Sequence, residues 1–302
     1  MVIVTSGARY IDIDAYACAV AYAELLRLLG EDVQAASTAT WNESISQSMI
    51  ALHAPFVTEY QASADDNYII VDVSDPTQFD KIVDVDRVAE VLDHHPGFEE
   101  YWTDRIADKS RIDFIGAAAT LIYERWAATD MLEHMSKESA ELLAAAILDN
   151  TLNFGAGVTT ERDKDAYKFL SEHASLDDAW LANYFTECQE AIVADLAESL
   201  RNDTKFLKFS GLQDELCLGQ MVVWDAKSII ASELNVISDT LGNMRGSWLA
   251  NLVSISEGRS YFLSDNDEVK QWLEPLVKVK FDGELAVADR LWLRKEIMKM
   301  GL

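Results

Sequence analysis

The chain has 302 residues, enough for about two domains that each bury a core of their own. Its composition, with 49% hydrophobic residues, 13 glycines and 4 prolines, is that of a globular protein and excludes a disordered or collagen-like chain. The 52 acidic residues outnumber the 25 basic ones and give a net charge of −27, so the surface should repel nucleic acid and anionic lipid. We therefore expect no extended nucleic-acid partner and no membrane partner, and a phosphate substrate would need bound cations to mask this field.

The cysteines and the N-terminus indicate in which cellular compartment the protein resides. Cys18, Cys188 and Cys217 are far apart and odd in number, which is typical of free thiols in a reducing compartment rather than of a disulfide framework. The N-terminus shows no basic segment followed by an apolar stretch of about 7 to 15 residues, and no apolar run approaches the roughly 18 residues of a membrane span. We expect a cytoplasmic protein.

Short apolar strands alternate with helical patterns in the first half of the chain. The β-branched run Val2–Val4 predicts a strand, and the apolar run Ala15–Leu29, which ends before Gly30, predicts a buried helix. Two further strands are predicted at Tyr68–Asp72 and Val88–Leu92. Helices are predicted at Gly116–Ala127, Lys137–Leu148 and Thr160–Glu172. Apolar strands that alternate with helices indicate an α/β fold with a doubly wound parallel sheet.

The pattern changes in the second half of the chain. A charged helical stretch covers Ser175 to Asn202, and shorter strands are predicted after it at Leu216–Val223, Trp248–Ser254, Tyr261–Leu263 and Val277–Phe281. This change indicates a second, smaller α/β domain. We place the boundary near Gln189–Leu196, which predicts domains at residues 1–190 and 191–302.

Three of the predicted strands end in acidic residues. Asp12 and Asp14 follow the first strand, Asp72 ends another, and Asp93-His94-His95 follows a third. A single Asp after a strand is usually a helix cap or a turn former. The carboxyl ends of parallel strands meet at one edge of the sheet, however, and one of these ends carries paired histidines.

Carboxylates with imidazoles, and without thiolates, predict a site for Mn²⁺, Mg²⁺ or Fe²⁺. Asp12 and Asp14 can face separate ions that Asp72 bridges. Such a pair of ions, about 3.5–4 Å apart, clamps the attacking and leaving oxygens of an in-line displacement.

These segments resemble the motifs of the DHH phosphoesterase superfamily. Leu92-Asp93-His94-His95 after an apolar strand is the signature, Gly7 to Asp14 resembles the first motif, and Ile70-Val71-Asp72 resembles the second. Two later segments are also similar to the family, namely Gly116–Thr120 and the fourth motif Ala145–Thr151, with Thr159–Asp163 after it. The resemblance implies an N-terminal DHH domain built on a doubly wound parallel sheet.

The second half resembles one branch of that superfamily. The oligoribonuclease branch carries a glycine pair in its C-terminal domain, and this chain has no Gly-Gly. Asp203–Phe206 and Leu293–Ile297 look instead like the two basic elements of the manganese-dependent inorganic pyrophosphatases and eukaryotic exopolyphosphatases. The resemblance implies a smaller α/β lid domain in which Lys205, Arg294 and Lys295 bind phosphate over a site between the domains. The alternative is that these are surface basic residues near a C-terminal helix.

The resemblance also implies roles for single residues. The metal ligands would be Asp12, Asp14, Asp72, His94, Asp149 and Asn150, holding two ions of Mn²⁺, or else of Mg²⁺ or Fe²⁺. His95 would contact the substrate and the leaving oxygen as a catalytic and substrate-binding residue, and Asp93 would be the catalytic residue that orients the histidines.

The implied function is a metal-dependent phosphohydrolase that cleaves the phosphoanhydride bonds of pyrophosphate or short polyphosphate with a metal-activated water. Two alternatives stay open. One is a phosphodiesterase for short oligonucleotides or cyclic dinucleotides, and the other is a catalytically weakened binding or regulatory protein. The partner would be a small phosphate-containing substrate, and a homodimer is also open.

Two positions depart from the family pattern. Ala8 stands where the first motif has a His or Asn, and Asn150 stands where the fourth motif has its ligand Asp, with Asp149 one residue earlier. One ion would therefore lose a side-chain ligand, and the other would have either an amide ligand or a shifted carboxylate. Lower affinity for at least one ion is the expected consequence.

Overall fold

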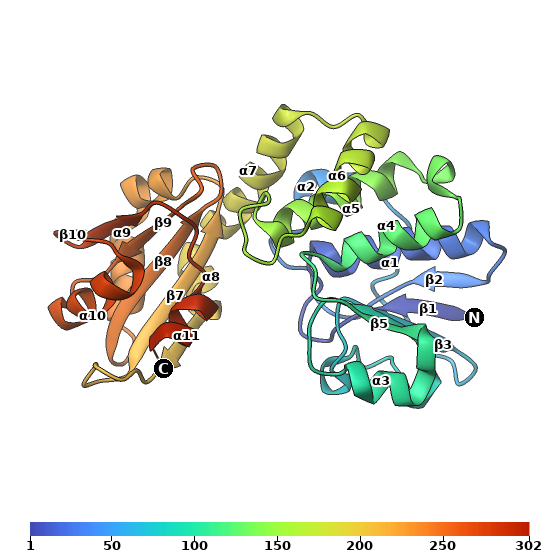
Figure 1. The fold of residues 1–302 in the computed structure, drawn as a ribbon, viewed down its shortest axis with the longest axis horizontal. Helices are drawn as coiled ribbons and strands as arrows, with labels where there is room; N and C mark the ends of the chain where they lie inside the picture. Colours follow the sequence, from blue (N-terminus) through green and yellow to red (C-terminus); the bar gives the residue numbers. More distant parts are fainter. Residues whose placement is uncertain (302) are drawn as a thin grey trace. The chain divides into compact units, whose positions relative to one another are not determined.

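The computed structural model describes residues 1–301 and divides the chain into two units, Met1–Tyr184 and the part from Phe185 on (Figure 1). This division falls six residues before the boundary expected from the sequence. Within residues 1–301, no helix has the length and apolar character needed to cross a membrane.

The first unit is built on a five-stranded parallel sheet with the order β2-β1-β3-β4-β5. Its strands are β1 (Val2–Thr5), β2 (Val33–Ala35), β3 (Asn67–Val71), β4 (Val88–Asp93) and β5 (Ser110–Ile112). The strand order reverses direction between β1 and β3. In an open parallel sheet that reversal opens a crevice past the carboxyl ends of the two strands, and ligands bind there.

Helices cover both faces of this sheet, as a doubly wound fold requires (Figure 1). The helices of the unit are α1 (Ile13–Leu28), α2 (Gln47–Ala51), α3 (Glu99–Ile106), α4 (Ala118–Ala128), α5 (Lys137–Thr151), α6 (Glu161–Ala174) and α7 (Asp178–Ala194), of which the last continues into the second unit. Helix α1 packs on both α4 and α5, and its alanines are buried on every side because small side chains let the helices approach closely. On the opposite face, α3 buries Trp102 against Phe79 and the apolar side chains of β3 and β4.

The second unit contains a six-stranded mixed sheet with the order β10-β11-β9-β8-β7-β6. Its strands are β6 (Thr204–Leu207), β7 (Leu216–Val223), β8 (Ser247–Ser254), β9 (Arg259–Leu263), β10 (Phe281–Asp282) and β11 (Leu285–Ala288). Only β7 and β8 pair in parallel, whereas the other neighbours are antiparallel. Alternate residues of β7 pack into two apolar layers, Cys217 and Met221 on one face and Leu216 and Leu218 on the other.

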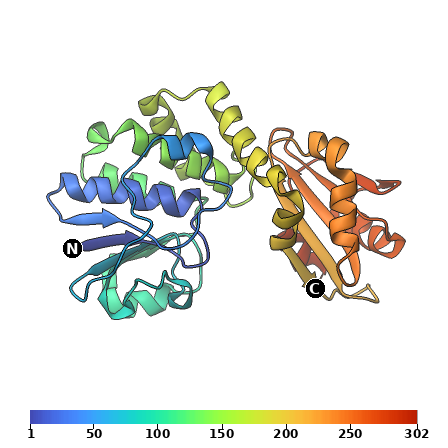
Figure 2. The ribbon, with the colours of Figure 1, turned by 180° about the vertical axis from the view of Figure 1, so that it is seen from behind.

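Two helices cover each face of this second sheet. Helices α8 (Leu196–Asn202) and α9 (Ala226–Gly242) pack on one face, seen in Figure 2, and α10 (Asp267–Val277) and α11 (Arg294–Gly301) pack on the other, seen in Figure 1. The strand predicted at Val277–Phe281 is wrong, because α10 continues to Val277 and Lys278 then turns with a φ of 57° before β10 begins at Phe281. The apolar spacing of a helix end was taken for a short strand.

Candidate metal centre

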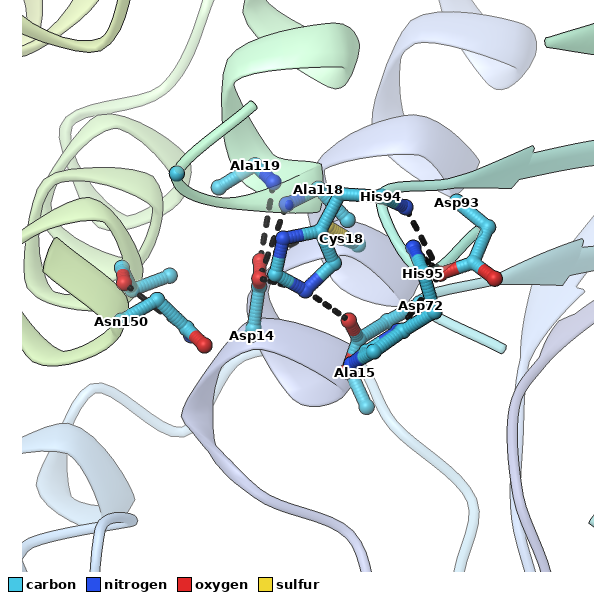
Figure 3. A network of polar contacts seen from close by, with 12 residues as sticks. Asp14, Ala15, Cys18, Asp72, Asp93, His94, His95, Ala118, Ala119 and Asn150 are labelled. Atoms are coloured by element: carbon cyan, nitrogen blue, oxygen red, sulfur yellow. Dashed lines mark hydrogen bonds and ion pairs between the residues drawn. The ribbon is translucent and has the colours of Figure 1, made fainter. Parts of the chain in front are cut away.

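The acidic residues predicted from the strand ends lie near one another past the carboxyl ends of β1, β3 and β4. Asp12 caps the N-terminus of α1, where its Oδ1 accepts a hydrogen bond from the backbone N–H of Ala15 at 3.0 Å. Asp72 directly follows β3, and Asp93 ends β4. Figure 3 shows Asp14, Asp72 and His94 turned toward one another at this edge of the sheet.

Asp14 is fully buried in the first turn of α1 and is held by three donors. Its two oxygens accept the backbone N–H groups of Ala118 and Ala119, both at 2.8 Å, and Oδ1 also accepts the thiol of Cys18 at 3.3 Å (Figure 3). The backbone donors belong to the first turn of α4, where the unpaired N–H groups and the helix dipole favour a negative charge. Asp14 is therefore anchored as a rigid anionic group, and its Oδ2 still faces His94 Nε2 at 3.9 Å.

A second buried carboxylate, that of Asp163, fixes the loop that leads into α4. Asp163 accepts hydrogen bonds from the backbone N–H of Gly116, from the hydroxyl of Thr120 and from both the N–H and the hydroxyl of Thr160. A Cβ on Gly116 would come within 2.7 Å of the Asp163 carboxylate and 2.6 Å of the Thr151 methyl group. The close approach of α5 and α6 thus requires a glycine at position 116, just before this helix.

Asp72 and His94 form the centre of the group. Asp72 has a φ of 60°, a left-handed conformation that costs free energy in a non-glycine residue and is concentrated at functional sites. Its Oδ1 lies 3.2 Å from His94 Nε2, and the two side chains are only 8% and 10% exposed. The other ring nitrogen, His94 Nδ1, lies 3.1 Å from the carbonyl oxygen of Ile115 and therefore donates to it.

This arrangement leaves lone pairs facing one another. When Nδ1 carries the proton, the neutral His94 ring presents the lone pair of Nε2 to the Asp72 carboxylate, and both Nε2 and Asp72 Oδ1 are buried without a hydrogen-bond partner among residues 1–301. Buried polar atoms of native proteins are almost always bonded. A cation between these atoms would satisfy both. Asp72, His94 and His95 are also close enough for one ligand atom of each to lie within 4.8 Å of the others.

The acids of the centre carry more negative charge than their surroundings compensate. Burial raises the pKa of Asp14 to about 6, with Asp12 adding to the rise, although His94 and the α4 backbone oppose it. Burial, together with Asp14 and Asp12, holds the pKa of Asp72 well above its usual range. Oxygen and imidazole ligands with this excess of charge fit a divalent cation such as Mn²⁺ or Mg²⁺.

Asp93 and His95 form an oriented pair next to the centre. The Asp93 carboxylate is fully buried, and its Oδ1 accepts the backbone N–H groups of His94 and His95 and lies 2.9 Å from His95 Nδ1 (Figure 3). The hydrogen bond that His95 Nδ1 donates to Asp93 raises the pKa of His95, whose ring is 62% exposed. With Nδ1 bound to Asp93, Nε2 is the ring nitrogen left for a ligand.

Ala8 and Asn150, the two positions that depart from the family pattern, lie in different segments of the first unit. Ala8 is exposed in the loop after β1, where its N–H donates to the Gln78 carbonyl oxygen, and its methyl side chain can bind no ion. At the end of α5, Asp149 accepts a hydrogen bond at 3.2 Å from the hydroxyl of Tyr184, whereas the amide nitrogen of Asn150 donates to the Ala146 carbonyl oxygen of its own helix (Figure 3).

The basic residues expected to bind phosphate lie in the second unit and differ in their surroundings. Lys205 on β6 and Lys295 in α11 are exposed. The Arg294 side chain is only 10% exposed, and its guanidinium binds both the backbone carbonyl and, at 2.5 Å, the carboxylate of Asp203. Arg294 therefore joins α11 to the start of β6, the strand that carries Lys205.

Several groups that shape the centre had no signal in the sequence. Ala118 and Ala119 contribute backbone N–H groups, and Ile115 contributes its backbone carbonyl oxygen. Because any residue type carries these groups, the sequence does not indicate that they contact the centre. Cys18 was interpreted only as a free thiol, although it lies one helical turn after Asp14. Tyr184 is distant in sequence from the residues it contacts, and nothing local distinguished it.

The comparisons with known proteins agree with this geometry. Residues 2–147 match the model of the DHH family, N-terminal domain. A probable manganese-dependent inorganic pyrophosphatase of Bacillus cereus (strain G9842) is 31% identical over 176 residues, which cover 57% of this chain and 55% of the relative. One of Lactobacillus acidophilus is 26% identical over 168 residues, covering 55% of this chain and 53% of the relative. The chain thus spans about half the length of the curated relatives it matches.

Solved structures share the fold over nearly the whole chain. The Methanococcus jannaschii putative family II inorganic pyrophosphatase aligns with 98% of this chain and 96% of its own, at a TM-score of 0.59 and 22% identity. An exopolyphosphatase-related protein from Bacteroides fragilis aligns with 99% of this chain and 89% of its own, at a TM-score of 0.54 and 12% identity. The resemblance drawn from the motifs is therefore confirmed for the first half of the chain, where residues 2–147 match the DHH family, N-terminal domain.

Proposed function

We propose that the chain is a metal-dependent phosphohydrolase that cleaves the phosphoanhydride bonds of pyrophosphate or short polyphosphate. The observation that carries the proposal is the pair of buried atoms Asp72 Oδ1 and His94 Nε2, which have no hydrogen-bond partner among residues 1–301. They lie within a group of acids in which burial and the neighbouring carboxylates raise the pKa values of Asp14 and Asp72. The names of the sequence relatives add manganese and pyrophosphate.

Asp12, Asp14, Asp72 and His94 would hold the metal in this proposal. When bound, Mn²⁺ at such ligands activates water as a nucleophile near neutral pH and polarises phosphoryl oxygens. The rigid anchoring of Asp14 by the α4 backbone and of His94 by the Ile115 carbonyl fixes the ligand directions in advance.

His95 would act on the substrate. The buried Asp93 carboxylate fixes its ring and favours the protonated form, so Nε2 can donate to a phosphate oxygen. A proton held at this atom would neutralise the charge that develops on the leaving phosphate. Lys205 and Lys295 would bind further phosphate oxygens, and Arg294 would support them through Asp203.

A cytoplasmic location goes with this proposal. All three cysteines are buried thiols, as expected in a reducing compartment.

The experiment is phosphate release from pyrophosphate, tripolyphosphate and a dinucleotide, each with Mn²⁺ and with Mg²⁺, by the full chain and by the Asp72→Asn variant. We expect release from the first two substrates with Mn²⁺, and its loss in the variant. Faster cleavage of the dinucleotide would replace this proposal with a phosphodiesterase. Tight Mn²⁺ binding without turnover of any of them would favour a catalytically weakened binding protein, as Ala8 suggests.

A further inference from the structure

The face of the second sheet that α10 and α11 cover carries polar side chains within an apolar layer. Each of them lies two positions along its strand from a residue of that layer, and therefore on the same face. They are Gln220 on β7, Asn251 on β8 and Ser260 on β9, which lie two positions from the apolar Leu218, Leu249 and Phe262. Asn251 and Ser260 are fully buried, and Gln220 is partly buried. We call these three polar residues the polar row.

The polar row binds the backbone of the segment that connects β11 to α11, and of the first residue of α11. The carbonyl oxygen of Trp292 accepts a hydrogen bond from the Asn251 amide at 2.7 Å, and the N–H of Trp292 donates to the Ser260 hydroxyl at 2.8 Å. Two residues later, the N–H of Arg294 donates to Gln220 Oε1 at 2.6 Å. Because the row binds main-chain groups of this segment, it fixes where α11 begins.

Gln220 also joins the start of α11 to the strand that carries Lys205. The Gln220 N–H donates to the carbonyl oxygen of Asp203 at 3.1 Å, and the same oxygen accepts from the Arg294 guanidinium. Gln220 therefore binds both Arg294 and the residue with which Arg294 forms its ion pair. Lys295, exposed in the first turn of α11, and Lys205, exposed on β6, extend from this junction.

The stability of the second unit does not explain the polar row. Asn251 Oδ1 is buried and has no hydrogen-bond partner within residues 1–301. A buried oxygen that loses its bonds to water and gains none costs free energy, whereas a leucine, which has the same branched shape, would continue the apolar layer. Polar groups that persist in a core at such a cost specify one arrangement and are expected at functional sites. The arrangement specified here is the start of α11.

We propose that Gln220 and Asn251 are positioning residues for phosphate binding. They hold the backbone at Trp292 and Arg294, so that the first turn of α11 presents Lys295 to a phosphate oxygen in one orientation. A group that is ordered in advance loses less entropy on binding than one that the substrate must order, so the polar row should act on substrate affinity. This inference rests on the proposed function only in taking Lys295 to bind phosphate.

The test is steady-state hydrolysis of pyrophosphate by the full chain at saturating Mn²⁺, with kcat and KM determined separately. Gln220→Met removes the acceptor of the Arg294 N–H with little change in shape. We expect its KM for pyrophosphate to rise about 3- to 10-fold, the scale set by ordering one side chain. Its kcat should stay within about twofold, because the residues expected to bind the metal lie in the first unit.

The matched control is Gln271→Met, the same substitution at an exposed position of α10, which should leave KM unchanged. Asn251→Leu removes the amide that binds Trp292 together with the unbonded oxygen. It should raise KM as Gln220→Met does, and it should leave the urea midpoint of unfolding unchanged or raise it. A merely structural role would lower the urea midpoint and leave KM unchanged, and that result in both variants would overturn the inference.

The proposed function and this inference fail separately when affinity is also measured by calorimetry with imidodiphosphate, a pyrophosphate analogue with a P–N–P bridge. Hydrolysis of pyrophosphate with an unchanged KM in both Gln220→Met and Asn251→Leu would refute the positioning role and leave the function. Imidodiphosphate binding that weakens in these variants, in a chain that hydrolyses no phosphoanhydride, would support the positioning role and refute the function. No binding of imidodiphosphate by the unsubstituted chain would overturn the inference.

Discussion

Replacing Asp149 with Asn should stabilise the metal-free protein. Burial, and the charges of Asp12 and Asp14, raise the pKa of Asp149 from 3.8 to about 7, even though the Tyr184 hydroxyl opposes the rise. Each unit of pKa corresponds to about 1.4 kcal/mol, so an ionised Asp149 costs the folded state up to about 4 kcal/mol above neutral pH. Because the side chain is partly exposed, we expect a gain of about 2 to 4 kcal/mol for Asp149→Asn at pH 7.5.

The stability advantage of Asp149→Asn should depend on pH. An acid whose pKa is raised by folding destabilises the folded state fully above the folded pKa, and the penalty disappears as the pH falls to the unfolded pKa. For Asp149 that window runs from about 7 down to about 4. The advantage of the variant should therefore be largest at pH 7.5, smaller at pH 5 and absent near pH 4.

Urea denaturation in EDTA at these three pH values measures the effect, with Asp163→Asn as the matched control. Asp163 receives four hydrogen bonds, and loss of an acceptor there should destabilise the protein at pH 7.5. Saturating Mn²⁺ should reverse the order for Asp149→Asn, because the unsubstituted chain gains more from bound ions. A variant that is less stable than the unsubstituted chain in EDTA at pH 7.5 would refute the reasoning.

Four further substitutions, one of them a control, test the rest of the centre and the second unit. Asp72→Asn should lower the Mn²⁺ affinity and reduce pyrophosphate hydrolysis at least about 100-fold, roughly 3 kcal/mol, with an unchanged circular dichroism spectrum; near-normal rate and metal content would contradict its central position. Ala8→His should tighten Mn²⁺ binding in a calorimetric titration by at least a few-fold, and an unchanged affinity would mean that another side chain serves that ion. Arg294→Ala should lower the free energy of unfolding of the second unit by about 1 to 3 kcal/mol, because it breaks the ion pair with Asp203. As the control, Lys295→Ala, at an exposed position, should change that free energy by less than about 0.5 kcal/mol. Equal thermal stability of these two variants would show that the Arg294 pair is not structural.

The sheet and the centre of the first unit were predictable because their signals are local. Strands β1, β3 and β4 are apolar runs that end in acids, and the strand-end rule then places Asp12, Asp72 and His94 at one edge. Strands β2 and β5 were missed because each has three residues, too few to show a period.

What could not be predicted depends on contacts between distant segments. The backbone donors to Asp14 exist only once α4 begins beside α1, and the Tyr184 hydroxyl reaches Asp149 across 35 positions of the chain. The spacing of residues likewise gave no sign that Arg294 would bind Asp203, 91 positions away. A motif predicts which residue types gather, whereas the hydrogen bonds that orient them follow from packing.

The most direct test of the central claim is the initial rate of phosphate release from pyrophosphate at pH 7.5. It should be measured on the full chain stripped with EDTA, then restored with Mn²⁺, beside a His94→Gln variant treated in the same way. We predict no release from the stripped chain, recovery with Mn²⁺ and a loss of at least about 100-fold in the variant, since His94 Nε2 faces Asp72 and Asp14 at the centre. Equal release with and without metal, or equal rates for His94→Gln and the unsubstituted chain, would contradict the account.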